Sequence, residues 1–136
     1  MSKIQHMVLF QFKSGTSEAI ISGLFDELAG LKSLCPGILH FAGGKYASPE
    51  RMNGDYTHGF LMTFDSSKNR DIYLPHPEHE RVKALILPHL ENVIAFDCED
   101  NSWSFQWRED NQNVQVEFRE RLLAGLGGPF PEFGPL

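Results

Sequence analysis

The chain has 136 residues, of which 41% are hydrophobic and 22% charged, and its formal net charge at pH 7 is -6. This hydrophobic content is enough to build a core and too high for a disordered protein. Phosphates and anionic lipids bind where positive charge is concentrated, and the sequence has no cluster of lysine or arginine. We therefore expect neither a nucleic-acid nor a membrane partner.

The N-terminal segment, the absence of long apolar stretches and the two cysteines bear on where in the cell the protein works. The N-terminus leads directly into a patterned segment, without the charged and apolar parts of a signal peptide. No stretch approaches the roughly 18 apolar residues that a membrane span needs. Cys35 and Cys98 lie far apart and lack CxxC spacing, which is typical of reduced, structural thiols. These features predict a cytoplasmic protein.

The first half of the chain predicts a strand, a helix and a second strand. Residues 3–13 alternate in polarity, which indicates a strand with one face made of Ile4, His6, Val8, Phe10 and Phe12. Thr16 or Ser17 can cap the following amphipathic helix of about 17 residues, which ends at Pro36-Gly37. Residues 38–46 then form a strand in which Gly43-Gly44 indicates a bulge or a close backbone approach.

The second half repeats this order after a loop at residues 48–54, which contains two turn signals. Residues 55–64 alternate in polarity, which indicates a strand with one face made of Tyr56, His58, Phe60, Met62 and Phe64. Ser66-Ser67 opens a short helix to about Tyr73. Pro77 is well placed as the first residue of another helix, which ends before Pro88. A fourth strand follows at residues 92–98.

The predicted order is β-α-β-β-α-β, the ferredoxin-like arrangement of the α+β class. Both helices would cover one face of a four-stranded antiparallel sheet. The other face would also be apolar, because it would carry Met7, Leu9, Leu39 or its neighbours, Leu61 and part of 93–96. An exposed patch of this kind marks an interface. We therefore expect a homodimer through the sheet face, which would form a dimeric α/β barrel.

Four segments in order resemble the stress-responsive A/B barrel, or Dabb, family. They are HMVLFQFK at 6–13, GDYTHGF at 54–60, YLPHPEH at 73–79 and IAFD at 94–97. The resemblance assigns residues 1–100 to the family domain and implies a ferredoxin-like protomer in a dimer. It implies no single activity, because the family includes plant stress proteins, a polyketide cyclase (olivetolic acid cyclase) and a hydroxynitrile lyase.

Three histidines and a tyrosine are the candidate functional residues. His6 and His58 lie on strand faces that the helices would cover, His79 shares a helix face with apolar residues, and Tyr73 precedes the break at Pro75. These side chains are expected to converge on one pocket between sheet and helices. Imidazoles titrate near neutral pH and a phenol can donate a hydrogen bond to an oxyanion, so this composition suits proton transfer.

Resemblance to the family's polyketide cyclase implies a role for each residue. His79 matches the catalytic base and Tyr73 its tyrosine partner, whereas His6 and His58 match substrate-binding histidines. Leu28 stands where the cyclase has a tyrosine, so this pocket is expected to differ in shape and polarity. Leu28 and Phe60 are predicted to contact the substrate.

Two functions follow from these observations. The first is a cofactor-independent acid/base enzyme, of cyclase or lyase type, acting on a small carbonyl compound. The second is a stress-responsive structural or small-ligand-binding protein, in which His6, His58 and His79 stabilise the fold. His76 and His79 are separated by Pro77, and we predict no metal site there. Residues 101–136, which hold both tryptophans, are expected to form an extension that packs on its own domain or on the dimer partner.

Overall fold

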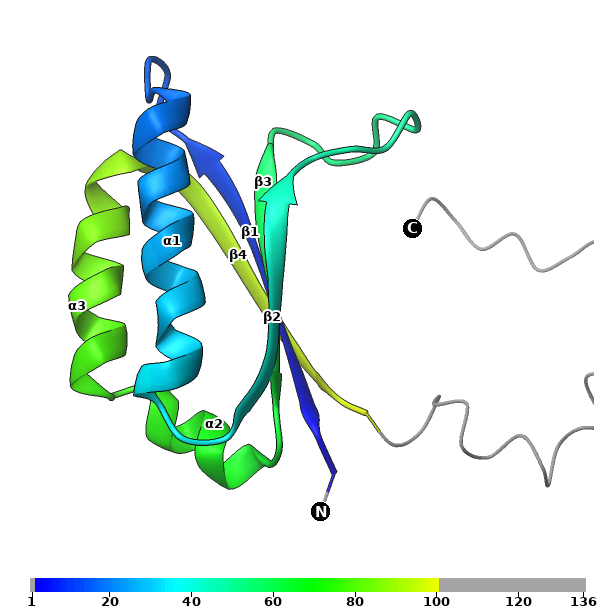
Figure 1. Ribbon diagram of the computed structural model, residues 1–136. Helices are drawn as coiled ribbons and strands as arrows, with labels where there is room; N and C mark the ends of the chain where they lie inside the picture. The colour runs from blue at the N-terminus through cyan, green and yellow to red at the C-terminus, as the bar shows by residue number, and fades with distance from the viewer. Residues whose placement is uncertain (1, 101–136) are drawn as a thin grey trace, which may run out of the picture. The chain divides into compact units, whose positions relative to one another are not determined.

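The computed structural model describes residues 2–100, which form a four-stranded antiparallel sheet with helices on one face (Figure 1). The predicted β-α-β-β-α-β order is confirmed. The elements are β1 (Ile4–Phe12), α1 (Glu18–Leu34), β2 (Ile38–Lys45), β3 (His58–Phe64), α2 (Ser67–Tyr73), α3 (Pro77–Ile86), the 3-10 turn η1 (Leu87–His89) and β4 (Leu90–Glu99).

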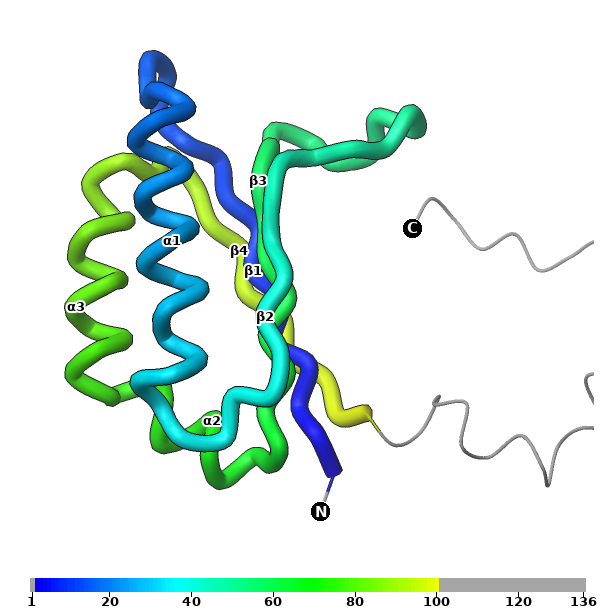
Figure 2. The backbone as a smooth tube through the Cα atoms, in the orientation of Figure 1, coloured from blue at the N-terminus to red at the C-terminus, as the bar shows by residue number. Residues whose placement is uncertain are grey.

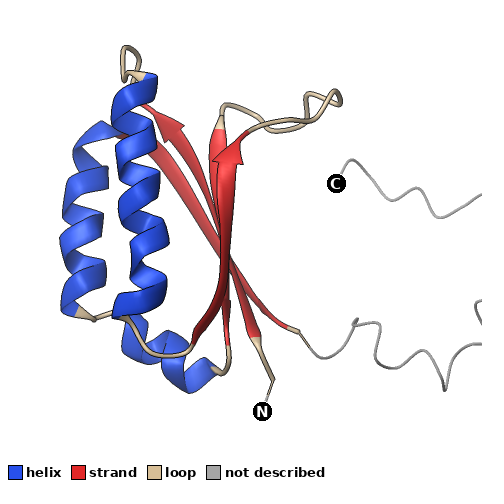
Figure 3. Cartoon of the chain, viewed as in Figure 1, coloured by secondary structure: helices blue, strands red, loops and turns tan. Residues whose placement is uncertain are grey.

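The strands lie in the order β2-β3-β1-β4, so β1 is central and pairs with both β3 and β4. Val8 of β1 lies opposite Phe60 on one side and Ala95 on the other. Residues that lie opposite each other in a sheet point to the same face. The alternation read from each strand therefore combines into two continuous surfaces, and Figure 3 shows the helices over only one of them.

Local capping explains where the helices begin. The Ser17 hydroxyl accepts a hydrogen bond from the backbone N–H of Ile20 at 3.2 Å, and the Ser66 hydroxyl accepts one from Asn69 at the same distance. Such bonds satisfy N–H groups that have no partner within the helix. Pro77 is the first residue of α3, as predicted. The α-helix ends at Ile86, and Pro88 lies within η1.

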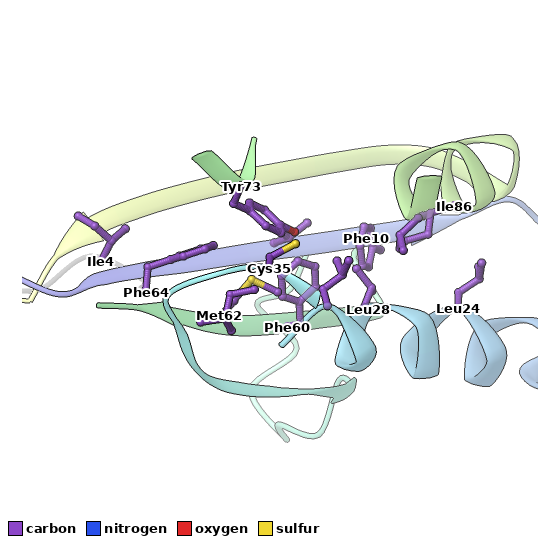
Figure 4. Close-up of a cluster of buried hydrophobic side chains, with 14 residues drawn as sticks. Ile4, Phe10, Leu24, Leu28, Cys35, Phe60, Met62, Phe64, Tyr73 and Ile86 are labelled. Atoms are coloured by element: carbon purple, nitrogen blue, oxygen red, sulfur yellow. The ribbon is translucent and has the colours of Figure 1, made fainter. Parts of the chain in front are cut away.

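The core lies between the sheet and the helices and is built from alternate residues of β1 and β3 and from one face of α1 (Figure 4). Met62, Phe64, Leu31 and Val82 are fully buried there. The Tyr73 ring lies in the same layer as these apolar side chains, close to Phe64. Burial of this apolar area is the main term that stabilises the fold.

The opposite face of the sheet is uncovered within the described residues. Leu9, Ile94 and Phe96 point to it and are 43%, 44% and 60% exposed. The register shows that Ile94 and Phe96 are the part of residues 93–96 on this face, whereas Val93 lies opposite Phe10 on the helix side. We call the surface formed by Met7, Leu9, Leu61, Ile94 and Phe96 the open sheet face.

One strand differs from its predicted bounds. β3 begins at His58 rather than at Asp55, so Tyr56 does not belong to its buried face. The cause is a turn in which the backbone N–H of Tyr56 donates to the carbonyl of Asn53 while the Asn53 amide donates back to the Tyr56 carbonyl. This turn belongs to a connection that extends away from the helices (Figure 2). β4 is also longer than predicted and begins at Leu90.

The glycine pair in β2 was predicted to mark a bulge or a close approach, and the close approach is confirmed at Gly43. A Cβ atom at Gly43 would lie 2.9 Å from the Phe25 ring and 2.9 Å from Cβ of Phe60. The irregularity in the ladder occurs instead between Ile38 and His40. The sequence therefore identified a crowded site, whereas the position of the irregularity depends on the pairing of β2 with β3.

Adding one methyl group at two different glycines is expected to have opposite effects on stability. Gly43→Ala should destabilise the protein by about 1–3 kcal/mol, because the strand must move away from Phe25 and Phe60. Gly23→Ala should stabilise it by about 0.5–1 kcal/mol, because Gly23 lies in α1 and its Cβ would meet nothing within 4 Å. Urea unfolding at one fixed protein concentration measures both. Equal effects would contradict the packing at Gly43.

Among residues 2–100, no helix has the length and apolarity needed to cross a bilayer. The extension at residues 101–136 lies outside the described residues. Its packing on the domain or on a dimer partner stays a prediction.

Candidate functional site

A cavity of about 230 Å³ lies between the helices and the β1 and β4 side of the sheet. The sheet contributes His6, Val8, Phe10, Phe60, Val93 and Ala95 to its lining, and the helices contribute Leu28, Tyr73, His79, Val82, Lys83 and Ile86. Val93 faces the helix side yet is 44% exposed. The cavity therefore opens to solvent along β4, the edge strand beneath α3.

The cavity has one polar end and one apolar end. His6, Tyr73 and His79 lie together at one end, with ring centroids 6.0 Å apart for His6 and Tyr73 and 4.2 Å apart for Tyr73 and His79. Along β1 the lining continues through Val8 to Phe10, where it meets Ile86, Leu87, Leu90 and Val93. A bound molecule would therefore place a polar group beside the histidines and an apolar part further along.

His79 is held in one orientation by the backbone. Its Nδ1 lies 2.9 Å from the carbonyl oxygen of Leu74, and a carbonyl only accepts hydrogen bonds. Nδ1 therefore carries the proton in neutral His79, which leaves the lone pair on Nε2. Burial lowers the pKa of His79 more than its bond to Leu74 raises it. A neutral imidazole that lines a cavity in this way is suited to accept a proton.

Tyr73 stacks on His79, with 28° between the two rings, and its side chain is buried. Burial raises the pKa of the phenol well above its usual range, and the neighbouring Cys35 and Asp97 add to that effect. The hydroxyl therefore keeps its proton near neutral pH. No hydrogen bond within the described residues reaches this hydroxyl. A buried donor without a partner is costly, so a polar group of a ligand would fit beside it.

His6 is held in place by Asp97, and Asp97 is held in turn by Arg70. Its Nδ1 lies 2.5 Å from Oδ1 of Asp97, and the other carboxylate oxygen of Asp97 lies 2.6 Å from Nη1 of Arg70. Burial by itself would raise the pKa of Asp97, but the hydrogen bonds from His6 and Arg70 outweigh it and hold that pKa below its ordinary value. Asp97 therefore stays ionised and can only accept hydrogen bonds.

His58 does not join the other two histidines, which corrects the prediction that all three converge. It is buried beneath the start of α1, between the rings of Phe12 and Phe25, and it does not line the cavity. Its Nδ1 lies 2.8 Å from the Thr57 hydroxyl, and Nε2 lies 4.0 Å from Glu18. Burial is the largest effect on its pKa and lowers it. The face of His58 was predicted correctly, but its place along the strand separates it from the site.

Leu28 and Phe60 line the cavity together with His6, Tyr73 and His79. His76 has a different task, because its Nδ1 accepts a hydrogen bond from the backbone N–H of Glu78 and caps α3. No group of three candidate metal ligands occurs in the part of the chain that the structure describes.

Sequence reasoning missed Asp97 and Arg70. Asp97 continues the alternation of Val93 and Ala95, so its face was readable from the sequence. Its pairing with His6 depends on the register between β1 and β4, which the sequence did not supply.

The sequence model of the family described as the stress responsive A/B barrel domain matches residues 4–100. The stress-response A/B barrel domain-containing protein HS1 of Arabidopsis thaliana is 33% identical over 101 residues, which cover 74% of this chain and 93% of that protein. Olivetolic acid cyclase of Cannabis sativa is 24% identical over 94 residues, which cover 69% of this chain and 93% of the cyclase.

Solved structures share the fold. The hydroxynitrile lyase of Passiflora edulis superposes with a TM-score of 0.69 at 19% identity, over 75% of this chain and 96% of the lyase. A dimeric ferredoxin-like protein of unknown function from Jannaschia sp. superposes with a TM-score of 0.65 at 26% identity, over 71% of this chain and 98% of that protein. The predicted ferredoxin-like architecture is confirmed, and it occurs in proteins that are dimers.

Proposed function

The chain belongs to the stress responsive A/B barrel domain family, and from this premise we propose that it is a cofactor-independent acid/base enzyme acting on a small carbonyl compound. The observation that carries the proposal is the polar end of the cavity. There His79 and Tyr73 stack at 4.2 Å, and within residues 2–100 neither Nε2 of His79 nor the buried hydroxyl of Tyr73 has a hydrogen-bond partner.

In the proposed reaction, Nε2 of His79 takes a proton from a carbon next to the carbonyl group. The electron pair of the broken C–H bond moves toward the carbonyl oxygen, which develops negative charge. The Tyr73 hydroxyl donates a hydrogen bond to that oxygen, and such donors stabilise a transition state most where water is excluded. The carbanion can then attack a second carbonyl in a cyclisation. In an adduct-cleaving reaction, His79 instead takes the proton of a hydroxyl group. The electron pair of the O–H bond forms the carbonyl bond, and the added group leaves that carbon with the electron pair of the broken bond.

The lining of the cavity indicates the shape of the substrate. Further along the cavity from the two histidines and the tyrosine, the lining includes Val8, Phe10, Ile86 and Val93, which offer only apolar contacts. A substrate with a carbonyl group at one end and an alkyl or aryl group at the other matches this distribution. Leu28 offers an apolar wall with no hydroxyl, which favours an apolar group at that point. A cyclase and a lyase stand among the proteins that this chain resembles, and both reaction types suit the arrangement.

A second candidate is a protein that binds a small apolar ligand without turning it over. The mainly apolar lining favours this function, as does the likeness to HS1, which is named for stress response. In that case His6 and His79 would bind the polar end of the ligand.

The working form in this proposal is a homodimer joined through the open sheet face. Leu9, Ile94 and Phe96 are exposed on this face, and exposed apolar patches of this kind are typical of interfaces. Two solved structures with a similar fold are described as dimeric ferredoxin-like proteins. The cavity lies on the opposite face of the sheet, so pairing through the open sheet face would leave its mouth accessible.

The proposal is tested with two probes. Phenylacetone in D2O reports proton abstraction through loss of its α-proton NMR signal, and mandelonitrile reports adduct cleavage through release of benzaldehyde. We expect the wild-type protein to accelerate at least one of these reactions. Chemical-shift changes at the cavity residues without turnover would favour the binding protein. The absence of both would contradict both candidates.

A further inference from the structure

Three residues from three elements form a row of charged hydrogen bonds that ends at the cavity. Arg70 of α2 donates to Asp97 of β4 at 2.6 Å, and the second oxygen of Asp97 lies 2.5 Å from Nδ1 of His6 on β1. We infer that Asp97 and Arg70 are positioning residues, which hold His6 in its Nδ1–H tautomer and keep its Nε2 open to the cavity as a second proton-transfer group. This role of His6 rests on the proposed function.

The hydrogen-bonding capacity of each group fixes the direction of the row. Arg70 has only donors, and an ionised carboxylate has only acceptors. Asp97 therefore receives one hydrogen bond from Arg70 and must receive the other from His6. A proton on Nδ1 of neutral His6 leaves the lone pair on Nε2, which makes no hydrogen bond within the described residues and belongs to a ring that lines the cavity.

Other groups around His6 agree with this assignment. The rings of Phe60 and Phe64 from β3 and of Tyr73 from α2 surround the imidazole, and among the described residues Nδ1 bonds only to Asp97. His79 of α3 faces His6 across the Tyr73 ring, and a charge on His6 disfavours a charge on His79. A charge on both imidazoles at once is therefore disfavoured.

Proton transfer between the substrate and the two imidazoles is balanced. Neutral His79 takes the proton from carbon through Nε2, and the electron pair of the C–H bond moves to the carbonyl oxygen. When Nε2 of His6 has taken up a proton through its lone pair, it gives that proton to the oxygen, which yields an enol. His79 is then protonated and His6 neutral, with the net charge of the site unchanged. Asp97 keeps its negative charge throughout, and it stabilises His6 while the imidazole carries the proton.

The test replaces the Asp97 carboxylate, which has two oxygen acceptors, with an amide, which has one oxygen acceptor and one NH2 donor group. In Asp97→Asn the amide oxygen is the only acceptor that the side chain at position 97 can offer to Arg70, so the NH2 group of that amide turns toward His6 and donates to Nδ1. His6 should then switch to the Nε2–H tautomer. Because Nδ1 then accepts a hydrogen bond, the ring can no longer carry a proton on both nitrogens, and His6 loses the charged form that gives a proton to the carbonyl oxygen. Asp71→Asn is the matched control, because Asp71 also bonds Arg70, at 2.9 Å, but is 65% exposed and is not bonded to His6.

The readout is the pair of imidazole 15N shifts of His6, together with phenylacetone exchange. We expect Nδ1–H in the wild type and in Asp71→Asn, and Nε2–H in Asp97→Asn with exchange slowed by about 10²-fold or more.

An Nε2–H tautomer in the wild type would overturn the inference even if Asp97→Asn fails to fold, and so would a tautomer that Asp97→Asn leaves unchanged. If the tautomer switches while exchange stays at the wild-type rate, the role of His6 in proton transfer is excluded. If the wild type shows no exchange, the proposed function fails, and the tautomers alone decide whether Asp97 and Arg70 position His6.

Discussion

Replacing His79 with alanine is expected to slow phenylacetone exchange by about 10²–10⁴-fold, the range that a positioned general base contributes. The change removes the only imidazole in the cavity whose Nδ1 is fixed by a backbone carbonyl, that of Leu74. His79 is half-buried and its main packing partner is Tyr73, so the fold should persist. Initial rates from NMR in D2O measure the effect. A binding protein would instead show no exchange in either the wild type or the variant.

His76→Asn is the control for His79→Ala. His76 lies one helical turn before His79 and does not line the cavity. Asparagine retains the capping function that His76 performs for Glu78, because it is among the preferred N-cap residues. Exchange should therefore stay near the wild-type rate. A similar loss in both variants would assign the effect to the start of α3 and not to His79.

The same experiment has a defined pH dependence. His79 must be neutral to act as a base, and burial lowers its pKa. The exchange rate should therefore rise with pH through the titration of His79, with the midpoint of that rise below about 6.5, the ordinary histidine pKa. The lowered pKa also means that the unfolded chain binds this proton more readily. The contribution of His79 to stability is thus present above the unfolded pKa and decreases as the pH falls from there toward the folded pKa.

Replacing Phe96 with aspartate is expected to convert the homodimer into a monomer. Phe96 is 60% exposed in the single chain and lies beside Met7 in the middle of the open sheet face. Pairing of two such faces would bury the carboxylate without a partner, which is far more costly than burying the phenyl ring. We expect the dissociation constant to rise by roughly 10²-fold or more, which corresponds to about 3 kcal/mol. Sedimentation velocity over a dilution series measures it.

Ile20→Asp is the matched control for the dimer. Ile20 is 42% exposed, but it lies on α1, which covers the opposite face of the sheet. An aspartate near the start of a helix is also electrostatically favourable. This variant should retain the wild-type dissociation constant. A wild-type protein that stays monomeric at all concentrations, or a Phe96→Asp variant that stays dimeric, would exclude the open sheet face as the interface.

The sequence was sufficient where a structural feature depended on local spacing. Alternation in β1 placed His6, Val8 and Phe10 on the covered face, and Ser17 located the start of α1. It was insufficient where two strands had to be aligned. Neither the contact between His6 and Asp97 nor the separation of His58 from the cavity follows from one strand alone.

A related limit applies to the loop before β3. Residues 55–57 continue the polar alternation of the strand, but Tyr56 forms a turn with Asn53 through two hydrogen bonds, and the strand begins after it. A pattern of alternating residues describes which way side chains would point in a strand. It does not determine where the strand begins when a side-chain amide can close a turn.

β4 couples dimer formation to ligand binding. Its alternate residues serve two surfaces, because Val93 and Ala95 line the cavity while Ile94 and Phe96 belong to the open sheet face. Any small shift of this edge strand on pairing changes both surfaces at once. If pairing alters the affinity for a ligand by some factor, the ligand must alter the strength of pairing by the same factor. Measuring the affinity for a probe ligand at several protein concentrations therefore shows how strongly dimer formation and ligand binding are coupled through β4.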